Sequence, residues 1–402
     1  MTKHFSIAGL FLTTLLMSNT GYTQTSLDGT KNFTTTAVPF LRISPDARSG
    51  AMGDAGIAID GDENSQYWNV GKMPFNEKKY GIAATYTPWL KDLVPDIFLA
   101  YISGYGKFGE DDNQTISASM RYFSLGTINY TDITGAPTGT GSPREYSFDL
   151  GYARKLSENL GLGVTGRYIH SAIVSNVSYQ PGVDYHPGNA VSADLGLFYT
   201  KTKEMEDAKN RKLNLGVVIS NLGSKISYNN TRKDFIPMNL GLGAAYTTQF
   251  DEYNKITFAL DVNKLLVPPQ AILTADSNAS IITAMTKSFQ GGDQLKKLDI
   301  SLGAEFWYQN QFAVRAGYFY EDKSNGDRQY ITAGVGIKYN TFALNCSYII
   351  PQGSGITRNP LSNTLRFTLY YSFDKFETPA PESTPSGEPA PAPAPAPPAE
   401  GK

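Results

Sequence analysis

The feature that most constrains the fold of this chain is a strict two-residue alternation in its last apolar stretch, residues 364–373. One set of alternate positions is apolar and ends in aromatic side chains: Leu365, Phe367, Leu369, Tyr371 and Phe373. The other set is polar and includes a cation: Thr364, Arg366, Thr368, Tyr370 and Ser372. A period of two residues predicts a β-strand. Its two unlike faces are typical of a strand that separates lipid from a polar lumen.

Stretches of this kind recur along the chain, and we predict fourteen strands from them. Each has about the length with which a tilted strand crosses a bilayer, and bacterial single-chain barrels have an even number of strands. The predicted strands are 79–87, 95–106, 114–124, 144–155, 159–170, 190–201, 212–221, 237–249, 254–263, 297–309, 311–322, 328–339, 341–350 and 363–374. The predicted fold class is therefore all-β, a transmembrane outer-membrane β-barrel of about 14 antiparallel strands with an N-terminal plug segment.

The connections between these strands alternate in length. Short turns, such as those at Asn310 and Asn340, alternate with long loops, such as 126–143 and 264–296. Periplasmic turns are short and external loops are long in outer-membrane barrels, so this alternation supports the strand assignment and predicts which end faces outward.

Ten charged residues lie on the polar faces of the predicted strands. They are Arg121, Asp149, Arg167, Asp194, Asp261, Asp299, Glu305, Arg315, Lys338 and Arg366. A cation that faces lipid at mid-membrane costs about 2–4 kcal/mol, and all ten of these charges avoid the apolar face. Acids and bases are balanced, so we expect paired side chains to fill the lumen, and we do not expect an ion-selective open pore.

Both ends of the chain are expected to lie outside the barrel, which spans 79–374. Residues 1–23 have the short apolar core and small terminal residues of a secretory signal peptide, with cleavage expected before Gln24. Residues 24–78 are expected to form a plug or a periplasmic segment. Residues 375–402 are rich in Pro and Ala and predict a semi-rigid periplasmic tail.

The composition favours a barrel and offers little for catalysis. The 25 Tyr and 38 Gly suit aromatic girdles and crowded inner walls, and a net charge of −2 argues against a nucleic-acid partner. Beyond the signal peptide the only histidines are His170 and His186, and no nucleophile motif, metal-ligand spacing or phosphate-binding loop accompanies them. We therefore expect no enzyme, no cofactor and no metal site.

Apolar residues in two predicted external loops are the candidate partner-binding residues. They are Trp89, Leu90, Leu93, Ile272, Leu273, Ile281, Ile282, Met285 and Phe289. Exposed apolar groups often mark a partner site, although these loops could instead pack on one another as a lid over the barrel mouth. The spacing of Ile281, Met285 and Phe289 fits a short amphipathic helix.

The segment before the first strand resembles a known family. Residues 44–58, SPDARSGAMGDAGIA, are similar to the "ARaaGMGdAgvA" stretch of the PorV/PorQ outer-membrane proteins. Residues 62–73 are similar to the "nssiyWNPAgla" motif of that group and of FadL-like barrels, with Val70-Gly71 where Pro-Ala is usual. The lead-in 37–43 and residues 86–90 resemble PorV (LptO) in particular. The matching plug-motif residues are Arg48, Met52, Gly53, Asp54, Trp68 and Asn69.

This resemblance implies a component of the type IX secretion system in the outer membrane of Gram-negative, Bacteroidetes-type bacteria. It implies a fourteen-stranded FadL-like barrel that accepts the C-terminal signal domain of exported cargo from the large translocon barrel. The barrel would then pass the cargo to the sortase complex for attachment at the cell surface. Besides these proteins, outer-membrane lipid is an expected partner. Two alternatives are a FadL-like transporter of hydrophobic small molecules and a lipid-modifying outer-membrane enzyme.

Overall fold

The structure is a computed structural model, and its strands close into one barrel. It describes residues 34–89, 96–131, 134–173, 185–205, 209–229, 232–268, 279–290, 293–323, 325–350 and 363–374. Within these residues fourteen antiparallel strands pair in the order β1-β16-β15-β14-β13-β12-β11-β10-β9-β8-β7-β6-β3-β2, and β2 returns to β1. The predicted number of strands and the closed barrel are confirmed. The predicted signal peptide and the Pro-rich tail lie outside the described residues.

The strands agree with the predicted ones to within a few residues. They are β1 (Tyr80–Pro88), β2 (Ile97–Phe108), β3 (Gln114–Leu125), β6 (Arg144–Lys155), β7 (Leu160–Ala172), β8 (Gly188–Lys203), β9 (Arg211–Gly223), β10 (Asn239–Gln249), β11 (Asn254–Leu265), β12 (Leu298–Tyr308), β13 (Phe312–Glu321), β14 (Gln329–Tyr339), β15 (Phe342–Ile350) and β16 (Leu365–Phe373). Two more strands, β4 (Ile128–Thr131) and β5 (Pro137–Gly141), pair only with each other.

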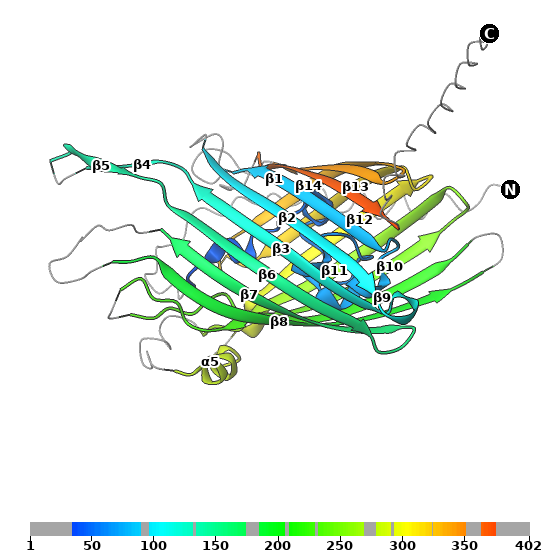
Figure 1. Cartoon of the computed structure of the whole chain (residues 1–402), viewed down its shortest axis with the longest axis horizontal. Coiled ribbons are helices and arrows are strands. Elements are labelled where there is room, and N and C mark those ends of the chain that lie inside the picture. The colour runs from blue at the N-terminus through cyan, green and yellow to red at the C-terminus, as the bar shows by residue number, and fades with distance from the viewer. Residues whose placement is uncertain are drawn as a thin grey trace, which may run out of the picture.

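The barrel has a loop end and a turn end, which we name by their connections (Figure 1). At the turn end short links such as 309–311 and 340–341 join consecutive strands, and Asn310 and Asn340 have positive φ values of 53° and 52°. Asparagine tolerates this conformation better than most residues, which explains the tight turns. At the loop end the β4–β5 hairpin projects from the barrel, where the sequence predicted only a loop. This part of the chain is rich in Thr and Gly and has no apolar alternation to reveal strands.

The two faces of the wall differ as the alternation predicts. Side chains such as Leu150, Val314 and Leu302 point outward and are 70%, 60% and 46% exposed. All ten predicted inward charges lie on the lumen face. Nine of them are buried, while Lys338 is half-exposed near the turn end. The outer wall is therefore suited to lipid, and the charges are kept in the interior.

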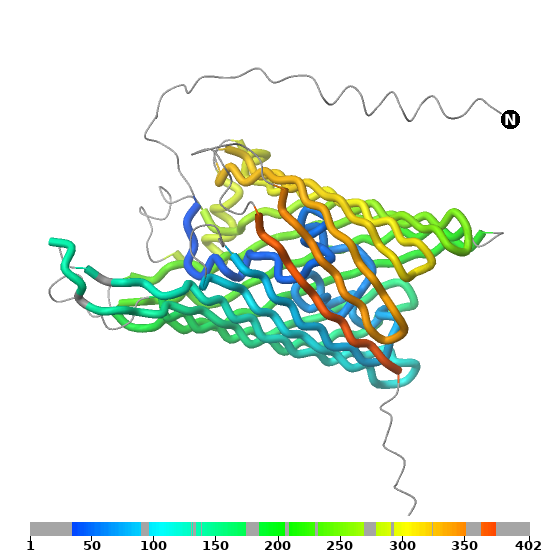
Figure 2. Tube along the Cα trace, turned by 90° about the horizontal axis from the view of Figure 1, so that it is seen from above, coloured from blue at the N-terminus to red at the C-terminus, as the bar shows by residue number. Residues whose placement is uncertain are grey.

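Residues 34–79 run through the lumen from the loop end to the turn end, and we call them the lumenal segment (Figure 2, blue). Near its start the Ala37 amide donates to the Phe235 carbonyl at 3.0 Å, beside the loop end. Near its finish the Lys79 carbonyl accepts from the Lys107 amide at 2.8 Å, at the turn end. Its short helical turns are η1 (Pro39–Arg42), α2 (Ala47–Gly50), α3 (Ser65–Trp68) and η2 (Val70–Phe75).

The remaining helical elements are short and lie in connections. They are η3 (Glu110–Asp112), α5 (Ile281–Ser288) and η5 (Gln294–Lys297). The chain between β11 and β12 contains α5, which lies at the loop end (Figure 1). Among the described helices, none has the length and apolar character needed to cross a membrane.

Candidate functional site

A buried ion-pair cluster fastens the lumenal segment to the barrel wall. The Arg48 guanidinium donates to both carboxylate oxygens of Glu305 on β12, from Nε at 2.9 Å and from Nη2 at 2.8 Å. The Nε atom of Arg315 on β13 donates to the same carboxylate at 2.6 Å. A carboxylate shared by two guanidinium groups satisfies charges that would otherwise be costly to bury. This cluster anchors the middle of the lumenal segment.

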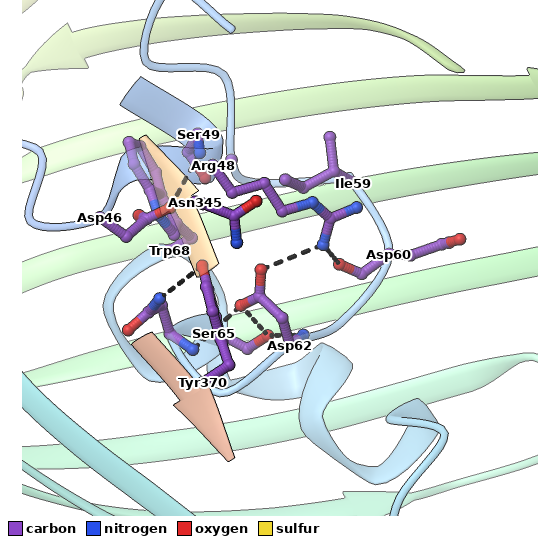
Figure 3. A network of polar contacts seen from close by, with 12 residues as sticks. Asp46, Arg48, Ser49, Ile59, Asp60, Asp62, Ser65, Trp68, Asn345 and Tyr370 are labelled. Atoms are coloured by element: carbon purple, nitrogen blue, oxygen red, sulfur yellow. Dashed lines mark hydrogen bonds and ion pairs between the residues drawn. The ribbon is translucent and has the colours of Figure 1, made fainter. Parts of the chain in front are cut away.

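Arg48 also closes the lumenal segment on itself (Figure 3). Its Nη1 atom donates to the Asp60 carbonyl at 3.0 Å and to the Asp62 carboxylate at 3.0 Å. The Asp62 carboxylate in turn accepts from the Asn64 amide at 2.9 Å, just before α3. The Asp60 side chain pairs with Lys212 at 2.7 Å. These two acidic residues thus hold the fold of the segment together.

Trp68 and Asn69 fix the second half of the motif. The Trp68 indole Nε1 donates to the Asp46 carboxylate at 2.7 Å. Its ring lies so close to Gly56 that a Cβ there would meet it at 2.1 Å. The Asn69 side chain donates to the Leu197 carbonyl on β8 at 3.0 Å and accepts from the Gly71 amide at 3.0 Å. The contacts of Trp68 and Asn69 need an indole N–H and a side-chain amide, and the close approach of Trp68 needs a glycine at position 56. These requirements account for the residue types of the motif.

The Met52-Gly53-Asp54 turn lies directly against β13. Gly53 has a φ of +68°, and a Cβ on it would lie 2.6 Å from the backbone of Tyr318. Met52 is fully buried. The Tyr330 hydroxyl donates to the Asp54 carboxylate at 2.5 Å, and the Arg366 guanidinium lies 3.5 Å from it. The six plug-motif residues therefore all take part in fastening the lumenal segment to the wall or to itself.

Lys72 is a further buried residue that the sequence did not single out. Its ammonium group is fully buried and donates to the Gly56 carbonyl at 2.6 Å. Asp261 on β11 accepts from the amides of Gly56 and Ile57 at 2.7 and 2.8 Å. A lysine in a helical turn gives no sequence signal of this role, because its partners are backbone atoms of a distant loop.

A cavity of about 640 Å³ lies on the loop-end side of the lumenal segment, and we call it the mouth cavity. Its apolar side is formed by Phe40, Leu41, Trp89, Phe123 and Leu125. Its polar side includes Ser44, Thr87, Asn239, Asp299, Ser301 and Arg366. Pockets of about 300–1,000 Å³ with apolar walls and a few converging polar groups are typical of ligand sites.

The candidate partner-binding residues lie in different surroundings. Trp89 is half-buried, with its ring 4.9 Å from that of Phe123. Ile281 and Met285 on α5 are partly buried and pack against an apolar cluster that includes Phe123 and Phe235. Ile282 and Phe289 are 75% and 52% exposed, as a partner surface requires. The other four candidates are outside the described residues: Leu90, Leu93, Ile272 and Leu273.

Each of the two histidines has one ring nitrogen close to a neighbouring oxygen atom. The Nδ1 atom of His170 is 2.8 Å from the Asn189 side-chain oxygen, and its ring stacks on Tyr146 at 4.8 Å. The Nδ1 atom of His186 is 3.1 Å from the carbonyl of Pro187. Within the described residues, no cluster of three or more His, Cys, Asp and Glu side chains has the geometry to hold a metal ion.

A closed fourteen-stranded barrel with an apolar outer wall and a filled lumen defines an outer-membrane β-barrel protein. The family described as type IX secretion system protein PorV matches residues 26–271. The chain therefore belongs to the PorV family, as the motif resemblance implied, and is an outer-membrane protein of type IX secretion. No curated protein sequence matches the chain.

Several solved structures are similar to this one at low sequence identity. The P. putida toluene transporter TodX is 10% identical with a TM-score of 0.49, and the match covers 82% of this chain and 99% of that one. The Ralstonia pickettii toluene transporter TbuX is 10% identical with a TM-score of 0.44, over 82% and 98%. A Pseudomonas aeruginosa FadL homologue is 10% identical with a TM-score of 0.41, over 83% and 98%.

Proposed function

We propose that this protein is a shuttle of type IX secretion. It binds the C-terminal signal domain of exported cargo at the large translocon barrel and delivers it to the sortase complex that attaches cargo to the cell surface. The observation that carries this proposal, beyond family membership, is a lumen filled by an ion-paired segment beneath a mouth with apolar surfaces. A filled barrel suits a carrier that works at its outer end.

The loop end is the end that meets cargo. In outer-membrane barrels the longer loops are external and the short turns are periplasmic, so the mouth cavity and α5 face outward. Ile282 and Phe289 present apolar surface there, with Lys264 stacked over the Phe289 ring at 5.1 Å. Exposed aromatic side chains at such a position are typical anchors of a protein interface.

Charged substitutions in α5 and at Phe289, the residue that follows it, test this surface. We expect Ile282→Asp and Phe289→Asp each to weaken capture of a purified cargo signal domain about tenfold, as loss of an interface anchor does. Leu156→Asp is the matched control, because Leu156 is 55% exposed but lies at the turn end. Binding can be measured by surface plasmon resonance on detergent-purified protein. Equal affinities for all three variants and the parent would rule out α5 as the cargo surface.

We propose further that the protein acts by binding and not by catalysis. His170 and His186 are engaged by an asparagine side chain and a backbone carbonyl, and neither hydrogen bond supports a nucleophile. We expect the double variant His170→Ala, His186→Ala to export and attach cargo as the parent does, within about twofold. Surface-attached cargo in a deletion strain complemented with each form is the measurement. Loss of attachment with a normally folded barrel would restore the enzyme alternative.

A transporter of hydrophobic small molecules is the second candidate, and the apolar side of the mouth cavity favours it. Transport needs a continuous path, however, and the Arg48–Glu305–Arg315 cluster fastens the lumenal segment to the wall beyond that cavity. Breaking such a buried cluster for each passage would cost several kcal/mol. The shuttle proposal requires no such opening.

A further inference from the structure

Arg366 on β16 is a buried cation with few partners at the floor of the mouth cavity. Its side chain is 5% exposed, and its Nε and Nη1 atoms make no hydrogen bond. The Asp54 carboxylate lies 3.5 Å from Nη1, too far for a strong charge-assisted bond. Buried guanidinium groups are normally satisfied, so an arginine that lines a cavity with its carboxylate partner 3.5 Å away can accept a further anion.

The other arginines that line the cavity are already neutralised. Arg42 contacts Asp299 at 2.5 Å, and Arg328 contacts Glu321 at 2.6 Å. Arg167 donates at 2.8 Å to each of two carboxylates, those of Asp149 and Asp194. An anion that enters the cavity therefore has its most favourable electrostatic interaction with Arg366.

The polar residues that line the cavity are of kinds that can bind a peptide. Ser44, Thr87, Asn239, Asp299 and Ser301 line it, and each has a buried side-chain oxygen without a hydrogen-bond partner among the described residues. Together they supply both donors and acceptors. A peptide backbone can use both kinds of group, whereas an alkyl chain would leave all of them unsatisfied.

The apolar side of the cavity indicates which side chains the ligand carries. The Phe40 and Trp89 rings both contact that of Phe123, with centroids 6.5 and 4.9 Å away. These rings offer a surface for apolar side chains within the same cavity. The volume of about 640 Å³ lies within the usual range for ligand sites and limits the ligand to a short segment.

We infer that the mouth cavity receives the free C-terminus of a peptide, with Arg366 binding its terminal carboxylate. This inference rests on the proposed shuttle function, and it names the part of the cargo signal domain that the barrel holds. The chain enters from the loop end, its last side chains pack on Phe40, Trp89 and Phe123, and its backbone bonds to the polar wall. A carboxylate on a guanidinium forms a strong, geometrically specific pair.

The test compares a peptide acid with its amide. A short fluorescent peptide copied from the end of an exported protein's signal domain is made with a free carboxylate and with a C-terminal amide. Full-length protein, purified in detergent, is titrated with each by fluorescence anisotropy. We expect the amide to bind the parent protein about tenfold more weakly than the acid, because it lacks the charged acceptor. Arg366→Met should abolish that difference, and Arg366→Lys should keep part of it.

Lys338→Met is the control, since Lys338 is a lumenal cation at the opposite end of the barrel. It should keep the full preference for the acid. Heat-induced mobility shifts on gels verify that each variant is a folded barrel. If acid and amide bind equally while the intact signal domain still binds, the inference is wrong and the shuttle function stands. If neither peptide nor intact domain binds, the shuttle function fails as well.

A second ligand distinguishes the source of the carboxylate. Dodecanoate carries the same charged group on an alkyl chain, and we expect it to compete weakly with the peptide acid. Tight binding of dodecanoate that depends on Arg366, together with no peptide binding, would assign the cavity to a fatty acid and overturn the peptide assignment.

Discussion

Replacing Gly317 by alanine should displace the lumenal segment from the barrel wall. A Cβ on Gly317 would lie 2.0 Å from the Gly53 nitrogen and 2.1 Å from the Met52 carbonyl carbon. Both are backbone atoms of a turn with positive φ, so neither can move aside as a flexible side chain would. Overpacking usually costs about 1–3 kcal/mol, and we expect the upper part of that range. Limited proteolysis should cut the lumenal segment faster, and the melting temperature should fall.

Gly166→Ala is the control for the change in strand propensity. Gly166 lies in β7, and a Cβ there would have no heavy atom within 4 Å. It should leave both the melting temperature and the protease pattern of the parent unchanged. If Gly317→Ala behaves like Gly166→Ala, the lumenal segment does not need its close approach to β13.

Removing the Glu305 carboxylate should destabilise the protein at least as much as Gly317→Ala does. In Glu305→Ala, Arg48 and Arg315 would remain buried with no charge between them. Breaking a buried ion pair by removing one partner costs about 3–5 kcal/mol. We therefore expect the lumenal segment to leave its place, which would expose a water-filled passage. Single-channel conductance in planar bilayers should rise from a closed baseline, and thermal unfolding in detergent should occur at lower temperature.

Glu77→Ala provides the comparison for this variant. Glu77 is 77% exposed and pairs with Lys338 at 3.4 Å, and such surface pairs contribute about 0–1 kcal/mol. It should keep the conductance and melting temperature of the parent. A Glu305→Ala protein with the low conductance of Glu77→Ala would show that other contacts suffice to hold the segment.

The sequence predicts the barrel wall well, because the pleat of a strand turns burial into a pattern of period two. Alternate residues of β16, for example, could be assigned to lipid or lumen without any coordinates. The interior is different, since its contacts join residues far apart in the chain. Arg48 and Glu305 are 257 residues apart, and local pattern cannot pair them.

The candidate site was likewise predicted only in part from the sequence. The resemblance to the PorV family identified Gly53 and Trp68 as motif residues. It did not identify the residues that pack against them in the folded protein. The position of Lys72 and the unused donors of Arg366 depend on backbone carbonyls and an empty volume that exist only after folding. The β4–β5 hairpin was missed because its composition is that of a loop.

The central claim is that the protein carries exported cargo, and gentle affinity purification of the tagged protein from outer membranes tests it most directly. Mass spectrometry of the eluate identifies both proteins and small molecules that stay bound. The shuttle account predicts exported proteins that share a C-terminal β-domain, together with a very large barrel or a sortase. Recovery of a fatty acid or another apolar molecule, without any cargo, would contradict it and favour the transporter.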